Sequence, residues 1–392
     1  MVVRSLGRSL VAAAGAVLCV VTIAAVPVRA SADHEPTALQ VQLERLVREL
    51  GIPGILATVT EPGSHGRTTT LRAGTGDLRT GLPVPMDGRV RIGSVTKAFV
   101  ATVVLQLVGE GRIGLDTAVE RYLPGVVRGN GGDGRAITVR QLLQHTSGLP
   151  DPGDLLPHDE EFARHRFDHH DRGELIRHAL DGRPTFVPPG AKGKWAYTNT
   201  GYLLLGMIIE RVTGARSWHD EVRRRITEPL GLRKTSSPRP AQYRVRGPHP
   251  RGYIRVASGM VDVTEQDAGY LDAAGDMIST PGEVNRFFLA LLRGRLLRPA
   301  ELAQMTRMTS ATPGGPVEHY GLGLERNELT CGGFVGHSGQ MHGYSTAAGL
   351  LVDRTGRPGR AVTVTITTEP RDMNDFRHLM KAVDTALCHV AG

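Results

Sequence analysis

The chain has few of the residues that mark several large classes of protein. Only 5% of its 392 residues are aromatic and only three are cysteine, and with five lysines almost all of the 47 basic residues are arginine. These arginines are spread along the whole chain and do not alternate with aromatic residues that could stack on bases. We therefore expect no nucleic-acid partner, despite a formal net charge of +8. With 40% hydrophobic and 22% charged residues, the composition excludes collagen and coiled coil and predicts a globular protein.

One long uncharged apolar run lies at the N-terminus. Residues 11–26 carry no charge, follow Arg4 and Arg8, and precede a stretch of small residues. This pattern is typical of a secretory signal peptide, so we predict that residues 1–32 are removed and that the protein is secreted to the cell-wall side. The alternative is a membrane anchor, but the run is shorter than the ~20 residues that span a bilayer. We expect no stable membrane insertion after cleavage.

The cysteines support the same compartment. Cys19 lies inside the apolar run, and the leucine before it does not fit a lipoprotein signal. Removal of residues 1–32 takes away three arginines, lowers the net charge to +5 and leaves Cys331 and Cys388. An even pair of cysteines in an exported protein predicts one disulfide, and the alternative is two free buried thiols.

Hydrophobic periodicity separates the two ends of the chain from its middle. The predicted elements are helices at 36–50, 94–110 and 374–389 and strands at 55–60, 68–73, 334–337, 345–352 and 361–367. Between them, helical patterns alternate with loops rich in proline and glycine. We predict an α/β (α+β) layer built from both termini, residues 33–115 and 320–392, with an inserted mostly helical domain at 116–319. A ligand site is expected in the cleft between the two.

Four histidines and two aspartates lie close together in one polar, loop-like stretch, namely His158, His165, Asp168, His169, His170 and Asp171. Their spacing does not match a catalytic zinc pattern such as H-E-x-x-H. We expect neither a metal site nor a cofactor.

A serine and a lysine one helical turn apart open the predicted helix at 94–110. Ser94 stands where backbone N–H groups at the helix start can stabilise an oxyanion. Lys97 lies three residues later, and burial in an apolar helix favours a neutral amine that can accept the serine proton. The structural alternative is a serine cap followed by a lysine that faces solvent.

Two further short motifs follow in the chain. Tyr197 and Asn199 are two residues apart before an apolar helix, so a phenol and an amide can point into one cleft. The alternative is a half-buried phenol and a helix cap. His337-Ser338-Gly339 ends a predicted strand, where the glycine would let a substrate backbone approach the strand edge.

In this order, the three motifs resemble those of the serine penicillin-recognising enzymes. Within them the chain resembles the branch of class C β-lactamases and secreted D-alanyl-D-alanine carboxypeptidases. The stretches at 141–150 and 320–324 are also typical of that branch, and the resemblance covers residues 39–388. It implies a β-lactamase/transpeptidase-like fold, an antiparallel sheet flanked by helices.

The resemblance also implies a role for each site residue. Ser94 would be the acylated nucleophile and Lys97 its proton partner, while Tyr197 would act as general base and proton relay. Asn199 would bind Lys97 and the substrate amide. His337 would line the cleft and offer a donor or positive charge near a substrate carboxylate.

The same resemblance implies the groups that bind the substrate. Ser338 and Gly339 would line the cleft, and the backbone N–H groups of Ser94 and Gln340 would form the oxyanion hole. Secreted carboxypeptidases commonly carry an arginine after the Gly-Leu-Gly-Leu stretch to bind the peptide carboxylate. Here Glu325 stands at that position, so either Arg326 takes over or the carboxylate is not bound in this way.

From the motifs and the predicted export we expect a monomeric D-alanyl-D-alanine carboxypeptidase. It would cleave the terminal D-Ala-D-Ala bond of peptidoglycan stem peptides through a Ser94 acyl-enzyme and be acylated by penicillins. The alternatives are a class C-like β-lactamase or a short-chain esterase on the same fold. A further alternative is a non-catalytic peptidoglycan- or penicillin-binding module, because a fold alone does not establish activity.

Overall fold

The computed structural model describes most of the chain after the predicted signal peptide, which lies outside the described residues together with His158. The described ranges are 37–63, 66–130, 132–152, 159–186, 193–239, 241–312 and 317–389. Within these ranges, no helix has the length and apolar character needed to cross a membrane.

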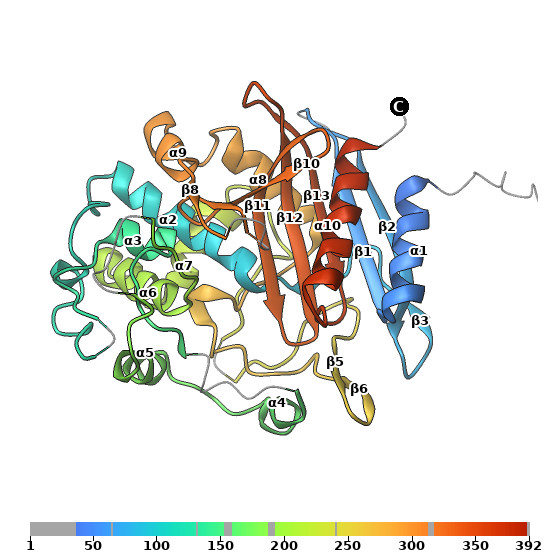
Figure 1. Ribbon diagram of the computed structural model, residues 1–392, viewed down its shortest axis with the longest axis horizontal. Helices are drawn as coiled ribbons and strands as arrows, with labels where there is room; N and C mark the ends of the chain where they lie inside the picture. The colour runs from blue at the N-terminus through green and yellow to red at the C-terminus, as the bar shows by residue number, and fades with distance from the viewer. Residues whose placement is uncertain are drawn as a thin grey trace, which may run out of the picture. The chain divides into compact units, whose positions relative to one another are not determined.

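One layer of the fold is a nine-stranded antiparallel sheet (Figure 1). Its strand order is β3-β2-β1-β13-β12-β11-β10-β9-β8, so strand β1 (Gly54–Thr60) near the N-terminus pairs with β13 (Pro358–Ile366) near the C-terminus. The other strands are β2 (Thr68–Asp77), β3 (Leu82–Pro83), β8 (Thr309–Ser310), β9 (His319–Tyr320), β10 (Glu325–Leu329), β11 (Gly332–Met341) and β12 (Tyr344–Val352). The predicted layer from both termini is confirmed, and so is its antiparallel pairing.

Helices cover both faces of this sheet. Helices α1 (Ala38–Leu50) and α10 (Met373–Cys388) pack together on one face, and α8 (Pro281–Leu292) packs on the other against β1, β12 and β13 (Figure 1). Helix α1 follows Thr37, whose side chain accepts the Gln40 N–H, and it ends at Gly51, which has the left-handed φ of 61° that glycine adopts without strain. The apolar faces of α1 and α10 share one core cluster with β1 and β13.

The middle of the chain forms the helical part of the molecule. Its centre is α2 (Thr96–Gly109), in which eleven of fourteen residues are buried. Helices α6 (Thr200–Thr213), α7 (Trp218–Val222) and α9 (Pro299–Met305) pack against α2. The other helices of this part are α3 (Val139–Gln144), α4 (Asp159–His165) and α5 (Arg172–Asp181). Two strand pairs, β4 (Val90–Arg91) with β7 (Ile278–Ser279) and β5 (Tyr253–Val256) with β6 (Gly259–Asp262), complete the fold. Because α2 is enclosed on all sides, any polar side chain on it must find partners inside the protein.

A disulfide joins Cys331 to Cys388, with the Cα atoms 5.6 Å apart. It ties the end of α10 to the turn before β11, so the predicted pairing is confirmed. The division into a sheet domain and an inserted helical domain, at the bounds expected from the sequence, stays a prediction.

Candidate active site

Ser94 and Lys97 meet at the start of α2. Ser94 lies in a 3₁₀ turn, Gly93–Val95, that leads into the helix, and Lys97 occupies the first helical turn. The Lys97 side chain is fully buried, and its Nζ lies 3.0 Å from Ser94 Oγ. The alternative of a lysine that faces solvent is excluded.

Lys97 Nζ has two further partners, both of which can only accept hydrogen bonds. They are Asn199 Oδ1 at 2.8 Å and the Ala274 carbonyl oxygen at 2.7 Å. A neutral amine has two N–H groups and one lone pair, so after donating to these two oxygens it directs its lone pair at the Ser94 hydroxyl. Burial lowers the pKa of Lys97 from 10.5 to about 7, and the charges of Asp151 and Glu325 oppose this shift. The neutral base is therefore accessible near pH 7.

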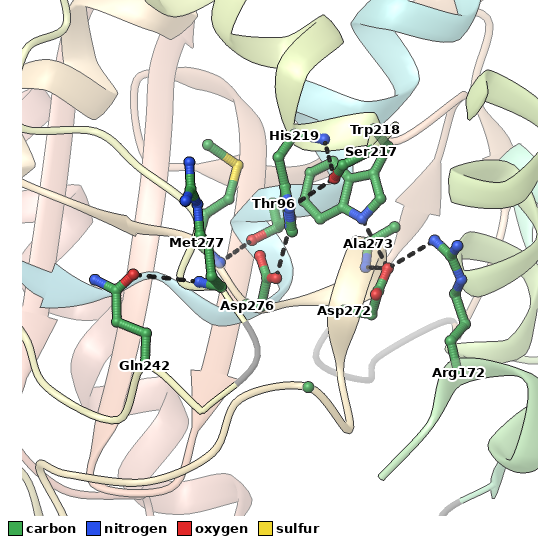
Figure 2. A network of polar contacts seen from close by, with 12 residues as sticks. Thr96, Arg172, Ser217, Trp218, His219, Gln242, Asp272, Ala273, Asp276 and Met277 are labelled. Carbon is green, nitrogen blue, oxygen red and sulfur yellow. Dashed lines mark hydrogen bonds and ion pairs between the residues drawn. The ribbon is translucent and has the colours of Figure 1, made fainter. Parts of the chain in front are cut away.

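The segment that supplies the Ala274 carbonyl oxygen to Lys97 lies within a polar network around Asp272, Thr96 and Met277 (Figure 2). Ala274 ends the 3₁₀ turn Asp272–Ala274. Asp272 accepts from Trp218 Nε1 at 2.7 Å, and three residues beyond the turn the Met277 N–H donates to the Thr96 hydroxyl at 3.2 Å. The carbonyl that binds Lys97 is thus anchored on both sides.

Tyr197 lies beside Lys97, with the phenol ring centroid 4.8 Å from Nζ. Its hydroxyl is buried, and the Ser94 side chain is the group that interacts with it. Burial raises the pKa of Tyr197 well above 10. The group is therefore a neutral phenol near pH 7, which suits a proton relay better than the expected general base.

Asn199 precedes α6 but its side chain does not cap that helix. It binds Lys97 instead, while its backbone N–H donates to the Asp151 carboxylate. Asn199 thus occupies the N-cap position, as the alternative held, but its side chain serves Lys97. The structure brings Ser94, Lys97, Tyr197 and Asn199 together.

His337 lies behind the cleft wall rather than in it. Its ring is fully buried, with Nδ1 against the Ser338 carbonyl oxygen and Nε2 2.8 Å from the Tyr320 hydroxyl. A carbonyl only accepts, so Nδ1 carries the hydrogen and Nε2 accepts from Tyr320. Burial, helped by the charge of Lys97, lowers the pKa of His337 to about 3. The expectation that His337 brings a positive charge to the substrate is therefore not met.

A cavity of about 430 Å³ opens at Ser94. Along the sheet it is lined by Glu325, Ser338, Gly339, Gln340, Ser345 and Thr346, with Tyr197 and Val317 nearby, and across from them by Pro370, Asp372, Met373, Phe376 and Leu379. The predicted substrate-binding residues Ser338, Gly339 and Gln340 are all in this lining.

Arg326 is not part of the cavity lining. It follows Glu325 on β10, and successive side chains of a strand point to opposite faces. Arg326 is partly exposed and pairs with Glu328, with Nε 3.0 Å from the carboxylate. Of the two expectations for this position, the structure favours the second, in which a terminal carboxylate is not bound by an arginine here.

Strand β11 and the turn that carries Ser94 approach each other through two glycines. A Cβ on Gly339 would lie 2.1 Å from the Ile92 carbonyl oxygen and 3.0 Å from the Ser94 nitrogen. A Cβ on Gly93, which has a φ of 52°, would lie 2.4 Å from the Gln340 carbonyl oxygen. Only glycine fits at these two positions. The close approach brings the backbones of Ser94 and Gln340 together. That their N–H groups form an oxyanion hole stays a prediction.

Comparison with known proteins agrees with this geometry. The family model described as Beta-lactamase matches residues 40–387. The chain belongs to the beta-lactamase family. Penicillin-binding protein 4 of Amycolatopsis lactamdurans is 34% identical over 200 residues, which are 50% of this chain and 48% of that protein, so the chain spans about half of this relative's length. The resemblance to penicillin-recognising serine enzymes of the beta-lactamase and penicillin-binding protein family is confirmed.

Two solved structures and one further relative are similar to most of the chain. A D-stereospecific amidohydrolase from Streptomyces sp. is 37% identical with a TM-score of 0.78, covering 90% of this chain and 98% of that one. A D-amino acid amidase from Ochrobactrum anthropi SV3 in complex with D-phenylalanine is 28% identical with a TM-score of 0.75, covering 89% and 96%. Esterase EstB of Burkholderia gladioli is 27% identical over 376 residues, which are 84% of this chain and 92% of that protein. These comparisons also confirm the predicted β-lactamase/transpeptidase-like fold.

Sequence reasoning missed one histidine of this beta-lactamase family site. His145 is fully buried, and its carbonyl oxygen and Nδ1 accept the N–H groups of Ala196 and Thr198, the two neighbours of Tyr197. The stretch at 141–150 had marked the family resemblance without marking this residue. Its position after α3, with a left-handed φ of 59°, could not be read from spacing.

Proposed function

We propose that this serine hydrolase cleaves amide bonds whose acyl side is a D-amino acid, through an acyl-enzyme on Ser94. The observation that carries the proposal is the buried Lys97 amine, which lies 3.0 Å from the nucleophile with its other partners on acceptor oxygens. The D-configured substrate class is supported by the two relatives whose names specify it, which are aligned over nearly their whole length.

In the proposed reaction, Ser94 Oγ attacks the amide carbon while its proton passes to neutral Lys97. The oxyanion forms next to the backbones of Ser94 and Gln340. The tetrahedral intermediate collapses, the C–N bond breaks, and the leaving nitrogen takes a proton relayed from Lys97 through the Tyr197 phenol. A water molecule then attacks the ester carbon and gives one proton to the same relay. The relay returns this proton to Ser94 Oγ as the C–Oγ bond breaks, which releases the acid and regenerates the Ser94 hydroxyl.

A second candidate is the D-alanyl-D-alanine carboxypeptidase expected from the sequence. It is supported by the His337-Ser338-Gly339 strand and by similarity to a penicillin-binding protein. Peptidoglycan stem peptides and β-lactams would then be its ligands. The alternative of a short-chain esterase is supported by the relative named Esterase EstB.

The experiment compares D-phenylalanine amide, L-phenylalanine amide, a D-alanyl-D-alanine peptide and p-nitrophenyl acetate as substrates. We expect the D-amide to be hydrolysed faster than the L-amide. Ser94→Ala should lose about a thousandfold or more in kcat, and mass spectrometry of the wild type with benzylpenicillin should show an adduct on Ser94. If the D-alanyl-D-alanine peptide is cleaved fastest, the carboxypeptidase takes the place of the amidase. Absence of all turnover and of any adduct would instead favour a non-catalytic binding module.

We also propose that the protein is exported from the cytoplasm. The predicted signal peptide at 1–32 and the Cys331–Cys388 disulfide both suit an oxidising compartment outside the cytoplasm. Detection of the processed chain in the culture medium or cell wall, with a new N-terminus near residue 33, would test it.

A further inference from the structure

We propose that the cleft selects substrates with a free, protonated amine and discriminates against substrates with a terminal carboxylate. This inference rests on the proposed Ser94 chemistry and names the substrate class of that site. It separates an amidase or aminopeptidase from a carboxypeptidase, two activities that share the same catalytic residues.

The charge of the cavity wall supports this selection. Among the described residues that line it, Glu325 and Asp372 are acidic and none is lysine, arginine or histidine. Lys97, whose charge acts on Glu325, is fully buried and is not part of the lining. Arg326, the one arginine expected to bind a carboxylate, is also outside the lining and pairs with Glu328. A carboxylate in this cleft would therefore meet like charge, with no counter-ion among the described lining residues.

The hydrogen bonds of Ser338 leave its oxygen as an acceptor toward the cavity. The Glu325 carboxylate accepts both the Ser338 N–H, at 2.9 Å, and the Ser338 hydroxyl, at 2.8 Å. A hydroxyl has one hydrogen, so once this is donated to Glu325 the Ser338 oxygen presents only lone pairs to the cavity. Such an oxygen binds an ammonium or amide N–H and cannot donate to a carboxylate.

The surroundings of Glu325 suit a bound cation as well. Its side chain is almost fully buried, the Ser338 N–H and the Ser338 hydroxyl both donate to it, and His337 Nδ1 lies 3.2 Å away. Burial raises the pKa of Glu325 to about 7, while the Ser338 bonds and the charge of Lys97 lower it. An ammonium group bound at Ser338 would stabilise the ionised carboxylate behind it, so binding of the cation and ionisation of Glu325 favour each other.

The test uses three compounds that share one scissile D-alanyl bond. They are D-Ala-D-Ala amide, which is cationic, N-acetyl-D-Ala-D-Ala amide, which is neutral, and N-acetyl-D-Ala-D-Ala, which is anionic. For the wild type we expect kcat/KM to be about tenfold or more higher for the cationic compound than for the neutral one, and lowest for the anionic one. High salt should narrow these differences.

The matched variants are Glu325→Gln and Glu328→Gln on the same strand. Glu325→Gln removes the charge and should lower kcat/KM about tenfold for the cationic compound, with a much smaller change for the neutral one. Glu328 is 55% exposed and outside the cavity, so Glu328→Gln should leave all three values unchanged. Ser338→Ala is a second variant, to be used if Glu325→Gln does not fold. It should also reduce the ratio of kcat/KM between the cationic and the neutral compound.

Measurements of binding test the preference for a cationic substrate independently of whether the substrate is hydrolysed. Calorimetry on the Ser94→Ala protein measures the affinity for each compound without turnover. Tighter binding of the cationic than of the anionic compound, lost in Ser94→Ala/Glu325→Gln, supports the inference even if none of the three is hydrolysed. Equal affinities, tighter binding of the anionic compound, or an equal loss for all three in Glu325→Gln would overturn it.

Discussion

The imidazole of His145 lies against the phenol of Tyr197, with the two ring centroids 4.2 Å apart. The same histidine accepts the backbone N–H of Ala196 through its carbonyl oxygen, at 3.0 Å, and that of Thr198 through Nδ1, at 3.3 Å. Its other side faces Tyr320, whose hydroxyl binds His337. His145 therefore holds the segment of Tyr197 on both sides and acts as a positioning residue.

Substitution of His145 should lower kcat more than it raises KM, because the residue orients Tyr197 without touching substrate. His145→Asn keeps an acceptor in place of Nδ1 and tolerates the left-handed backbone. His145→Phe keeps a ring but leaves the buried Thr198 N–H unpaired, at a cost of about 1–3 kcal/mol. We expect the Asn variant to retain more activity than the Phe variant in steady-state assays.

The control for this pair is His178→Asn, since His178 is an exposed residue of α5. It should match the wild type in kcat and in thermal stability. A His145→Phe protein with wild-type kcat would contradict the positioning role, as would an Asn variant that performs worse than the Phe variant.

Much of the site could be predicted because it depends on local spacing. Ser94 and Lys97 are one helical turn apart, and the burial of their helix follows from its apolar residues. By contrast, the orientation of His337 depends on which face of β11 each residue occupies, and a shift of one residue reverses it. The meeting of Glu325 with Ser338 depends on pairing between β10 and β11, and His145 reaches Tyr197 through tertiary contacts 52 residues along the chain. Such relationships leave no signal in a single sequence.

The pH dependence of kcat/KM should reflect the protonation of Lys97. Deprotonated Lys97 accepts the Ser94 proton, and its pKa is lowered to about 7, so kcat/KM should rise with pH below 7 and level off above it. The Asp151 charge favours the protonated lysine. Asp151→Asn should therefore lower the pKa of Lys97 further and move the acid limb of the profile to lower pH.

The measurement is kcat/KM for a neutral substrate across the pH range in which the protein stays folded. Glu49→Gln, on the exposed side of α1, is the matched removal of a distant carboxylate and should leave the limb in place. A limb that moves to higher pH in Asp151→Asn would assign it to a different group.

The close approach of β11 to the Ser94 turn predicts a sharp difference between two glycine substitutions. Gly339→Ala would place a Cβ 2.1 Å from the Ile92 carbonyl oxygen. Strand β11 would therefore have to move, and the Gln340 N–H of the predicted oxyanion hole would move with it. Acylation of Ser94 should fall by about a hundredfold or more. Gly282→Ala, in α8 with no atom within 4 Å of the added Cβ, should keep full activity and gain up to about 1 kcal/mol in stability. Penicillin labelling and thermal melts measure both, and a fully active Gly339→Ala protein would show that this contact does not shape the site.

The disulfide should contribute to stability without being required for chemistry. It closes a loop between Cys331 and Cys388, 57 residues apart, for which loop entropy gives about 4 kcal/mol. Cys331→Ser/Cys388→Ser should lower the free energy of unfolding in urea by up to this amount, while kcat changes little because neither sulfur lines the cavity at Ser94. Dithiothreitol should destabilise the wild type and leave the double variant unaffected. Helix α10 contributes Met373, Phe376 and Leu379 to the cavity wall. If kcat of the double variant falls together with its free energy of unfolding, the prediction is wrong and the disulfide holds this helix in its active position.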